Sequence, residues 1–141
     1  MSYFSDHYKD LSYPVADPSG GLYNAQLGAI HRIAAHFTVS EQAALVTMPT
    51  GSGKTAVLMM TPFVLRAERV LVITPSRMVR EQIVEDFGGL VTLRQTAVIP
   101  AAVRSPRVKE LISRIASTAE WEALRQFEVI VSTPNCASPA Y

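Results

Sequence analysis

The sequence has few of the features that mark several large classes of protein. It holds one cysteine among 141 residues, so no internal disulfide can form, and no Cys/His spacing resembles a zinc site. Thirteen Lys and Arg against twelve Asp and Glu leave a net charge of +1, which excludes a broadly basic nucleic-acid coat. The longest uncharged apolar stretch, residues 56–65, is far below the roughly 20 residues that span a bilayer. We expect a cytoplasmic protein without a membrane partner.

What the chain does contain is enough apolar sequence for a folded unit. Apolar residues make up 48% of it and charged residues 18%, a balance that supports a buried core. A chain close to the roughly 150 residues of an average domain predicts one domain. The first 21 residues differ, because they carry two prolines and two adjacent glycines without sustained periodicity. We therefore predict a loose leader over residues 1–21 and the folded domain over residues 22–141.

Hydrophobic periodicity predicts helices that alternate with short apolar strands. Ile30, Ile33 and Phe37 repeat at helical spacing, and Pro62 is expected to bend or end a later helix. Helices are predicted over residues 22–37, 55–65, 76–88, 105–115 and 121–127. Strands are predicted over residues 43–48, 69–74, 97–99 and 129–132.

The helix predicted from Ser105 depends on a Ser-Pro start signal and an apolar stripe at Val108, Leu111, Ile112 and Ile115. Strands that alternate with helices indicate βαβ units, and so an α/β fold with a parallel sheet. The strands are continuous apolar runs, which predicts helices on both faces of that sheet.

The segment MPTGSGKT, residues 48–55, lies between a predicted strand and a predicted helix, as a phosphate-binding loop (P-loop) requires. Gly51 and Gly53 allow positive φ, so that backbone N–H groups form an anion cradle at a helix N-terminus. Lys54 would reach the β- and γ-phosphates, and the Thr55 hydroxyl would hold Mg²⁺. Met48 stands where the strict pattern has a glycine, and the alternative is a glycine-rich turn with a solvated lysine. We favour a nucleotide site formed by Thr50, Gly51, Ser52, Gly53, Lys54 and Thr55.

The sequence around this loop resembles superfamily 2 helicases and translocases of the DEAD/DEAH type. The run MPTGSGKTAVLMMTPFVL is similar to motif I of that family, and TPSRMVREQ is similar to motif Ia. VIVSTPN resembles the Thr-Pro signature that precedes the acidic motif II, and LYNAQLGAI resembles a pattern whose glutamine reads the adenine edge. These resemblances follow the family's order from residue 22 to residue 135, nearly the whole chain.

The resemblance implies the first RecA-like domain of an ATP-driven motor, an incomplete P-loop NTPase fold with ATP and Mg²⁺ as cofactors. It makes Lys54 and Thr55 the catalytic residues and gives Gln26, with Tyr23, the contact to adenine. A glutamine on a helix flank is the structural alternative for Gln26. DNA or RNA, as a single strand or a duplex junction, would contact Arg77, Gln82, Thr133 and Pro134, for which exposed helix residues and a Thr-Pro bend are the alternatives.

Two parts of the family's machinery do not occur in these 141 residues. Nothing acidic follows Glu128, so the Asp-Glu motif that holds Mg²⁺ and positions water is missing, as is a second RecA-like domain with its arginine finger. We expect negligible ATP hydrolysis by this chain alone, and open edges on the strand that feeds the loop. A truncated or partial gene product and one piece of a larger assembly both fit this pattern, with downstream sequence or the second RecA-like domain as the missing partner.

Three functions stay open at this stage. We favour the ATP-binding part of a nucleic-acid helicase or translocase. A non-catalytic fragment that regulates a nucleic acid or a partner protein is the second. Another P-loop enzyme, such as a kinase or GTPase, is the third, although the sequence has no Asn-Lys-x-Asp base-reading motif.

Overall fold

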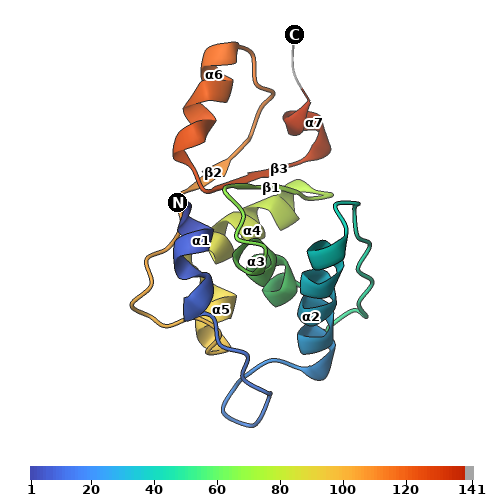
Figure 1. The fold of residues 1–141 in the computed structure, drawn as a ribbon. Coiled ribbons are helices and arrows are strands. Elements are labelled where there is room, and N and C mark those ends of the chain that lie inside the picture. The colour runs from blue at the N-terminus through green and yellow to red at the C-terminus, as the bar shows by residue number, and fades with distance from the viewer. Residues whose placement is uncertain (139–141) are drawn as a thin grey trace. The chain divides into compact units, whose positions relative to one another are not determined.

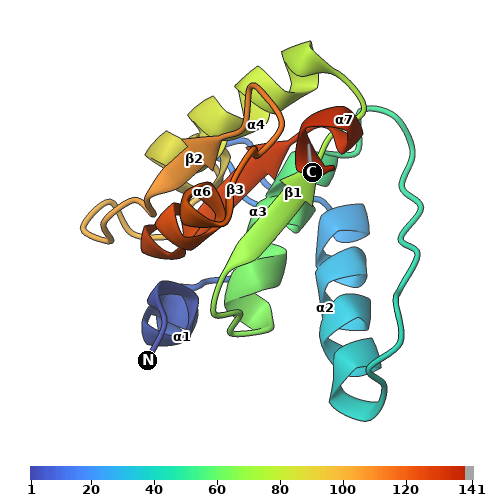
Figure 2. The ribbon, with the colours of Figure 1, turned by 90° about the horizontal axis from the view of Figure 1, so that it is seen from above.

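A computed structural model describes residues 1–138 as two compact units (Figures 1 and 2). The first unit consists of Met1–Ala67 and Thr92–Val103 and is built from helices. The second consists of Glu68–Val91 and the chain from Arg104 onward, and it contains a three-stranded parallel sheet with helices. The predicted α/β class is confirmed.

The first unit is centred on α2 (Asn24–Val39) and α3 (Lys54–Val64), which pack against each other. α2 buries Ile30 and Ile33, as its periodicity predicts, whereas Phe37 of the same predicted stripe is exposed. α3 buries six of its eleven residues, as expected for a helix that is apolar on all sides, and it ends shortly after Pro62. No helix among residues 1–138 has the length and apolarity to cross a membrane.

The start of the chain is packed, which differs from the loose leader that its composition indicated. Helix α1 (Tyr3–His7) and the 3-10 turn η1 (Tyr8–Asp10) form there. Phe4 is fully buried, and its ring centroid lies 4.9 Å from that of Phe63 in α3. Burial of aromatic rings stabilises this short helix, and a five-residue helix is too short for a periodicity signal to reveal it.

Residues 43–48, predicted as a buried strand, form no strand. None of their backbone N–H or C=O groups takes part in a hydrogen bond within the described chain. Leu45 is 93% exposed, and Met48 is the one buried residue of the segment. The prediction is wrong because an apolar run becomes a strand only where a neighbouring strand accepts its backbone hydrogen bonds.

The sheet of the second unit has the order β1-β3-β2, formed by β1 (Val70–Ile73), β3 (Val129–Ser132) and β2 (Val108–Glu110). Both neighbours run parallel to the central β3, all of whose residues are buried. The prediction that both faces are covered holds for β3. It is wrong for β1, where Leu71 and Ile73 are 52% and 45% exposed.

Four helical elements complete the second unit: α4 (Arg77–Gly89), α6 (Thr118–Ala123), the 3-10 turn η2 (Leu124–Gln126) and α7 (Pro134–Ala137). α4 begins where predicted, because the Ser76 hydroxyl accepts a hydrogen bond from a first-turn N–H. α4 contacts β2 and β3. α6 and η2 overlap the short helical piece predicted before β3, and α6 begins three residues earlier than predicted.

Residues 97–99 form a turn instead of the strand predicted there. The turn follows α5 (Val91–Gln95), a helix that the sequence did not indicate, and Ala97 in it has a φ of 59°. Val98 and Ile99 are nevertheless buried. The apolar run is therefore used for packing without any sheet pairing.

The helix predicted from Ser105 is also wrong, since β2 and a loop occupy that segment. Pairing of β2 with β3 outweighs the helical spacing of the apolar side chains. Leu111 and Ile115 of the predicted stripe are still buried, whereas Ile112 is 73% exposed.

Candidate functional site

The loop singled out by its glycines leads directly into α3, with Gly53 as the helix N-cap. Gly51 and Gly53 have φ values of 79° and 78°, so both adopt the left-handed conformation that the motif predicts. Ser52 closes the turn, because its N–H and its hydroxyl both donate to the carbonyl of Pro49, at 3.2 and 2.6 Å. Thr50 is exposed at the start of the loop.

The backbone N–H groups of Gly51, Gly53, Lys54 and Thr55 have no acceptor within residues 1–138, and neither has that of Thr50 at the start of the loop. They lie at the N-terminus of α3, where the aligned peptide dipoles favour a negative ligand. The Lys54 ammonium and the Thr55 hydroxyl also form no hydrogen bond with the described residues. The donor set fits a phosphate chain with its cation. No group of three or more His, Cys, Asp or Glu in the described part of the chain is arranged to hold a metal.

Gln26 and Tyr23, which the resemblance implies would contact adenine, lie at the start of α2. The Gln26 side-chain carbonyl accepts from the N–H of Tyr23 at 2.7 Å, and its amide group donates to the carbonyl of Gly53 at 3.0 Å. Gln26 is 4% exposed, whereas Tyr23 is 61% exposed. The glutamine is therefore next to the phosphate loop, and both ends of its amide are bound to backbone.

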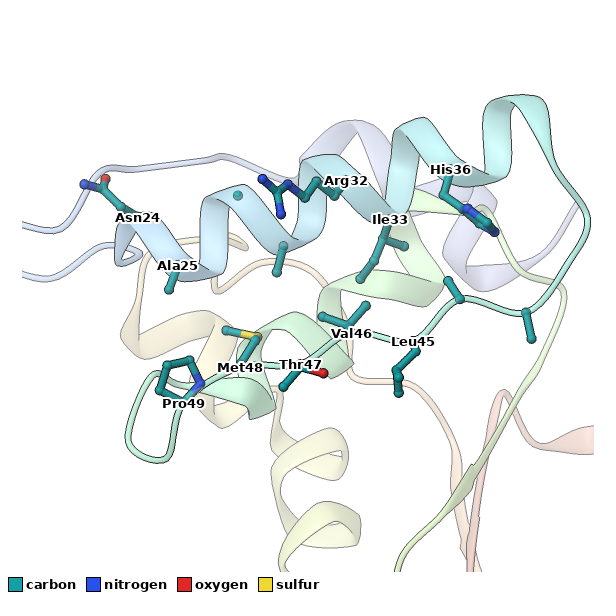
Figure 3. A pocket seen from close by; sticks show the side chains of 14 residues that line it. Asn24, Ala25, Arg32, Ile33, His36, Leu45, Val46, Thr47, Met48 and Pro49 are labelled. Carbon is teal, nitrogen blue, oxygen red and sulfur yellow. The ribbon is translucent and has the colours of Figure 1, made fainter.

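An open cavity of about 670 Å³ lies between α2 and the segment that forms no strand (Figure 3). Asn24, Arg32 and His36 line it from α2, and His36 is hydrogen-bonded to the carbonyl of Gln42 at 2.8 Å. A second cavity of about 300 Å³ extends from the same segment to Lys54. Both cavities are lined by apolar side chains of that unpaired segment.

The residues that were expected to contact nucleic acid lie in the second unit, near the ends of β1 and β3. Arg77 and Gln82 are exposed on α4, and the Arg77 guanidinium is paired with Glu81 at 2.9 Å. Thr133 is the half-buried N-cap of α7, and Pro134 is its first residue. β1 and β3 are parallel neighbours, so both segments follow the carboxyl edge of the sheet, where ligands bind in many α/β proteins.

One further cation lies beside the Thr-Pro segment. The Arg114 guanidinium donates to the side-chain oxygen of Asn135 at 2.9 Å. Asn135 follows Thr133 and Pro134 directly, in α7. Nothing in the sequence indicates this contact beyond the excess of basic residues around Arg114.

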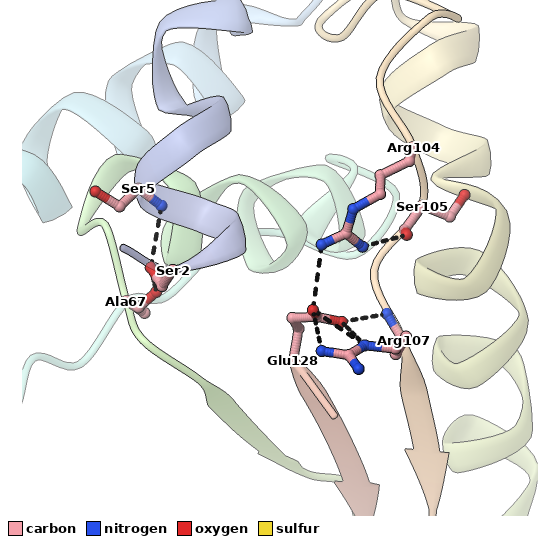
Figure 4. Close-up of polar contacts among 7 residues, drawn as sticks. All are labelled: Ser2, Ser5, Ala67, Arg104, Ser105, Arg107 and Glu128. Atoms are coloured by element: carbon pink, nitrogen blue, oxygen red, sulfur yellow. Dashed lines mark hydrogen bonds and ion pairs between the residues drawn. The ribbon is translucent and has the colours of Figure 1, made fainter. Parts of the chain in front are cut away.

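A buried carboxylate joins β2 and β3 at their starts (Figure 4). Glu128, with a side chain that is 8% exposed, accepts from the backbone N–H of Arg107 at 2.6 Å and from its guanidinium at 2.9 Å. Arg104 lies 3.3 Å from the same carboxylate. Burial acts to raise the pKa of Glu128, but the hydrogen bonds from Arg107 and Arg104 and the charge of Arg107 outweigh it, so this pKa is lowered.

Comparison with known families agrees with the motifs. The family model described as "Type III restriction enzyme, res subunit" matches residues 20–137, which is most of the chain. No curated protein and no solved structure matches. The chain therefore belongs to this family, and it is an N-terminal RecA-like domain of the superfamily 2 helicase-like kind.

Proposed function

From this family membership, we propose that the chain is the ATP-binding part of an ATP-dependent helicase or translocase that acts on DNA or RNA. The observation that carries the proposal is the set of N–H groups without acceptors around Lys54 at the start of α3. Backbone donors at a helix N-terminus, with one ammonium group beside them, are suited to a phosphate chain.

Different groups of the loop would bind different parts of the nucleotide and its cation. The N–H groups of Gly51, Gly53, Lys54 and Thr55 would hold the phosphate oxygens, and the Lys54 ammonium would offset charge on the β- and γ-phosphates. The Thr55 hydroxyl would be a ligand of Mg²⁺, which supplies further charge neutralisation at the transferred phosphate.

Hydrolysis needs more than this loop. The 141 residues contain no Asp-Glu pair to position water and no second RecA-like domain. An arginine finger alone contributes on the order of 10³ to 10⁵ in rate. We therefore propose that this polypeptide binds ATP but hydrolyses it negligibly until downstream sequence or a second RecA-like domain completes the site.

Nucleic acid would bind at the carboxyl edge of the second unit. Arg77 and Gln82 on α4 and Thr133 before α7 present exposed or half-buried polar groups there. The Arg114 guanidinium also lies next to this segment, because it donates a hydrogen bond to Asn135. Such contacts go to phosphates and carry little sequence preference, and the resulting affinity falls with salt.

Isothermal titration with ATP and Mg²⁺ tests the proposal. We expect the parent chain to bind, and Lys54→Ala to weaken binding by about 10- to 100-fold, the effect of losing one or two charge-assisted hydrogen bonds. If the parent gave no more binding heat than Lys54→Ala, the proposal that this loop binds nucleotide would be wrong. Tighter binding of GTP than of ATP would favour another P-loop enzyme. Nucleic-acid binding that Lys54→Ala leaves intact, with no nucleotide affinity in the parent, would favour a regulatory fragment.

A further inference from the structure

We propose that Arg80 is a positioning residue for nucleic acid, which holds α4 and α7 in one arrangement through a buried contact with Glu110 and Cys136. This inference rests on the proposed function, because α4 and α7 carry residues assigned there to nucleic acid. All the groups concerned belong to the second unit.

A cation occupies the buried face of α4. The buried residues of this helix are Arg80, Ile83 and Phe87, at a spacing where an amphipathic helix normally presents apolar side chains. Val79, an apolar neighbour in the sequence, is only half-buried. Arginine is almost never fully buried unless it is paired, so Arg80 at 5% exposure requires a partner.

The Arg80 guanidinium joins three segments. Its Nε donates to a carboxylate oxygen of Glu110, the last residue of β2, at 2.8 Å. Its Nη1 lies 3.9 Å from the Sγ of Cys136 in α7. The Glu110 carboxylate has no other hydrogen bond or ion pair within the described residues. One side chain of α4 therefore contacts both the end of β2 and the helix that follows β3.

These contacts connect the two segments that were assigned to nucleic acid. Arg77 and Gln82 flank Arg80 in the sequence of α4 and are exposed, and Thr133 and Pro134 begin α7. Hydrogen bonds of a guanidinium are directional, whereas apolar contact is not. Arg80 thereby favours one placement of α4 relative to α7, and so one spacing of the groups that meet the phosphates.

Stability alone is a poor explanation for this ion pair. Removal of two charges from water offsets much of their attraction, and replacement of a buried pair by well-packed apolar side chains is often neutral or stabilising. The Arg80 side chain is 6% exposed and that of Glu110 is 28% exposed, so the arginine bears most of this cost. A pair that adds little to the free energy of folding can still select one arrangement of the chain.

Glu110→Gln tests the inference, because charge and positioning predict opposite results. Binding of a fluorescent oligothymidine of about 20 nucleotides would be followed by anisotropy. Loss of a negative charge should strengthen binding to a polyanion if charge alone matters. We expect binding about three- to tenfold weaker, since the charge-assisted bond that holds Arg80 becomes a weaker neutral one.

Glu85→Gln is the matched control. It removes the same charge from an exposed position of α4 whose side chain has no partner in the described chain. It should bind the oligothymidine within about twofold of the parent, or more tightly.

A double variant, Arg80→Met with Glu110→Met, separates positioning from stability. The net charge of +1 is unchanged, because one charge of each sign is lost. We expect thermal melting close to that of the parent, with oligothymidine binding at least about threefold weaker. A role in stability alone predicts the parent's affinity in a variant that melts as the parent does. If the double variant does not fold, Glu110→Gln decides the question.

The outcomes distinguish this inference from the proposed function. Binding by Glu110→Gln that equals or exceeds that of Glu85→Gln overturns the inference and leaves the proposed function intact. The parent's affinity in a folded double variant has the same meaning. A parent chain that does not bind the oligothymidine overturns the proposed contact with nucleic acid, and the inference with it.

Discussion

Two uncharged apolar segments of the chain, residues 43–48 and β3, differ sharply in how they are packed. β3 has a parallel neighbour on each side, and all four of its residues are buried. Residues 43–48 make no backbone hydrogen bond within the described chain, and Leu45 is 93% exposed. Both segments are uncharged and mostly apolar, although β3 is richer in β-branched residues, and they differ in whether other strands lie beside them. A strand is a property of the sheet that holds it, and side chains alone do not make one.

The largest expected effect comes from placing the same charge in both segments. Val131→Asp, at a fully buried position of β3, should destabilise the second unit by at least about 3 kcal/mol, because a buried carboxylate without a partner is very unfavourable. Leu45→Asp should change stability by no more than about 0.5 kcal/mol. Chemical denaturation followed by circular dichroism measures both. Equal losses of stability in the two variants would mean that residues 43–48 are buried in solution, and would contradict the difference described between the two segments.

A smaller effect is expected where β3 begins. Glu128→Gln removes the charge that Arg107 and Arg104 share, and we expect a loss of about 1 to 3 kcal/mol, as for hydrogen bonds to a charged group. Glu122→Gln is the matched control, since that carboxylate forms an exposed pair with Arg125, and it should cost less than about 1 kcal/mol.

The same carboxylate predicts a pH dependence of stability. The pKa of Glu128 is lowered by folding, so the unfolded chain takes up a proton at a higher pH than the folded chain. Its contribution is therefore fully present above the ordinary value of 4.5 and is lost as the pH falls through the folded pKa. The stability difference between parent and Glu128→Gln should shrink over that range. A difference that stays constant down to the acid limit would contradict this assignment.

The smallest effect is expected for Leu45→Pro. Proline removes a backbone N–H, which costs about 3 kcal/mol or more inside a regular element. The N–H of Leu45 donates to nothing in the described chain, so we expect a loss below about 1 kcal/mol. Thermal melting measures it. A loss above about 2 kcal/mol would indicate that this N–H is bonded in solution, for example to a strand outside residues 1–138.

Short-range sequence signals, such as caps and apolar spacing, predicted the helices that those same residues stabilise. The cap at Ser76 predicts the start of α4, and the spacing of Ile30 and Ile33 predicts α2. The segments that depend on distant neighbours were not predictable in this way. Helical spacing of apolar residues between Ser105 and Ile115 was outweighed by pairing with β3, and no rule of local sequence contains that pairing.

The candidate site follows the same division. Positive φ at Gly51 and Gly53 could be predicted, because the glycines and the helix after them are adjacent in sequence. The bond from Gln26 to Gly53 spans 27 positions and gives no sequence signal. The bond from Arg114 to Asn135 is similarly remote. The backbone conformation of the loop was therefore predictable, whereas its contacts with distant residues required the folded chain.

The turn after α5 holds one residue in a strained backbone conformation. Ala97 is exposed and adopts a left-handed backbone, a conformation that disfavours an L-residue by about 1 kcal/mol and that glycine adopts freely. The strain serves no packing, since the methyl group faces solvent. Ala97→Gly would relieve this strain but would also give the unfolded chain more conformational freedom, so the two effects on stability would largely cancel.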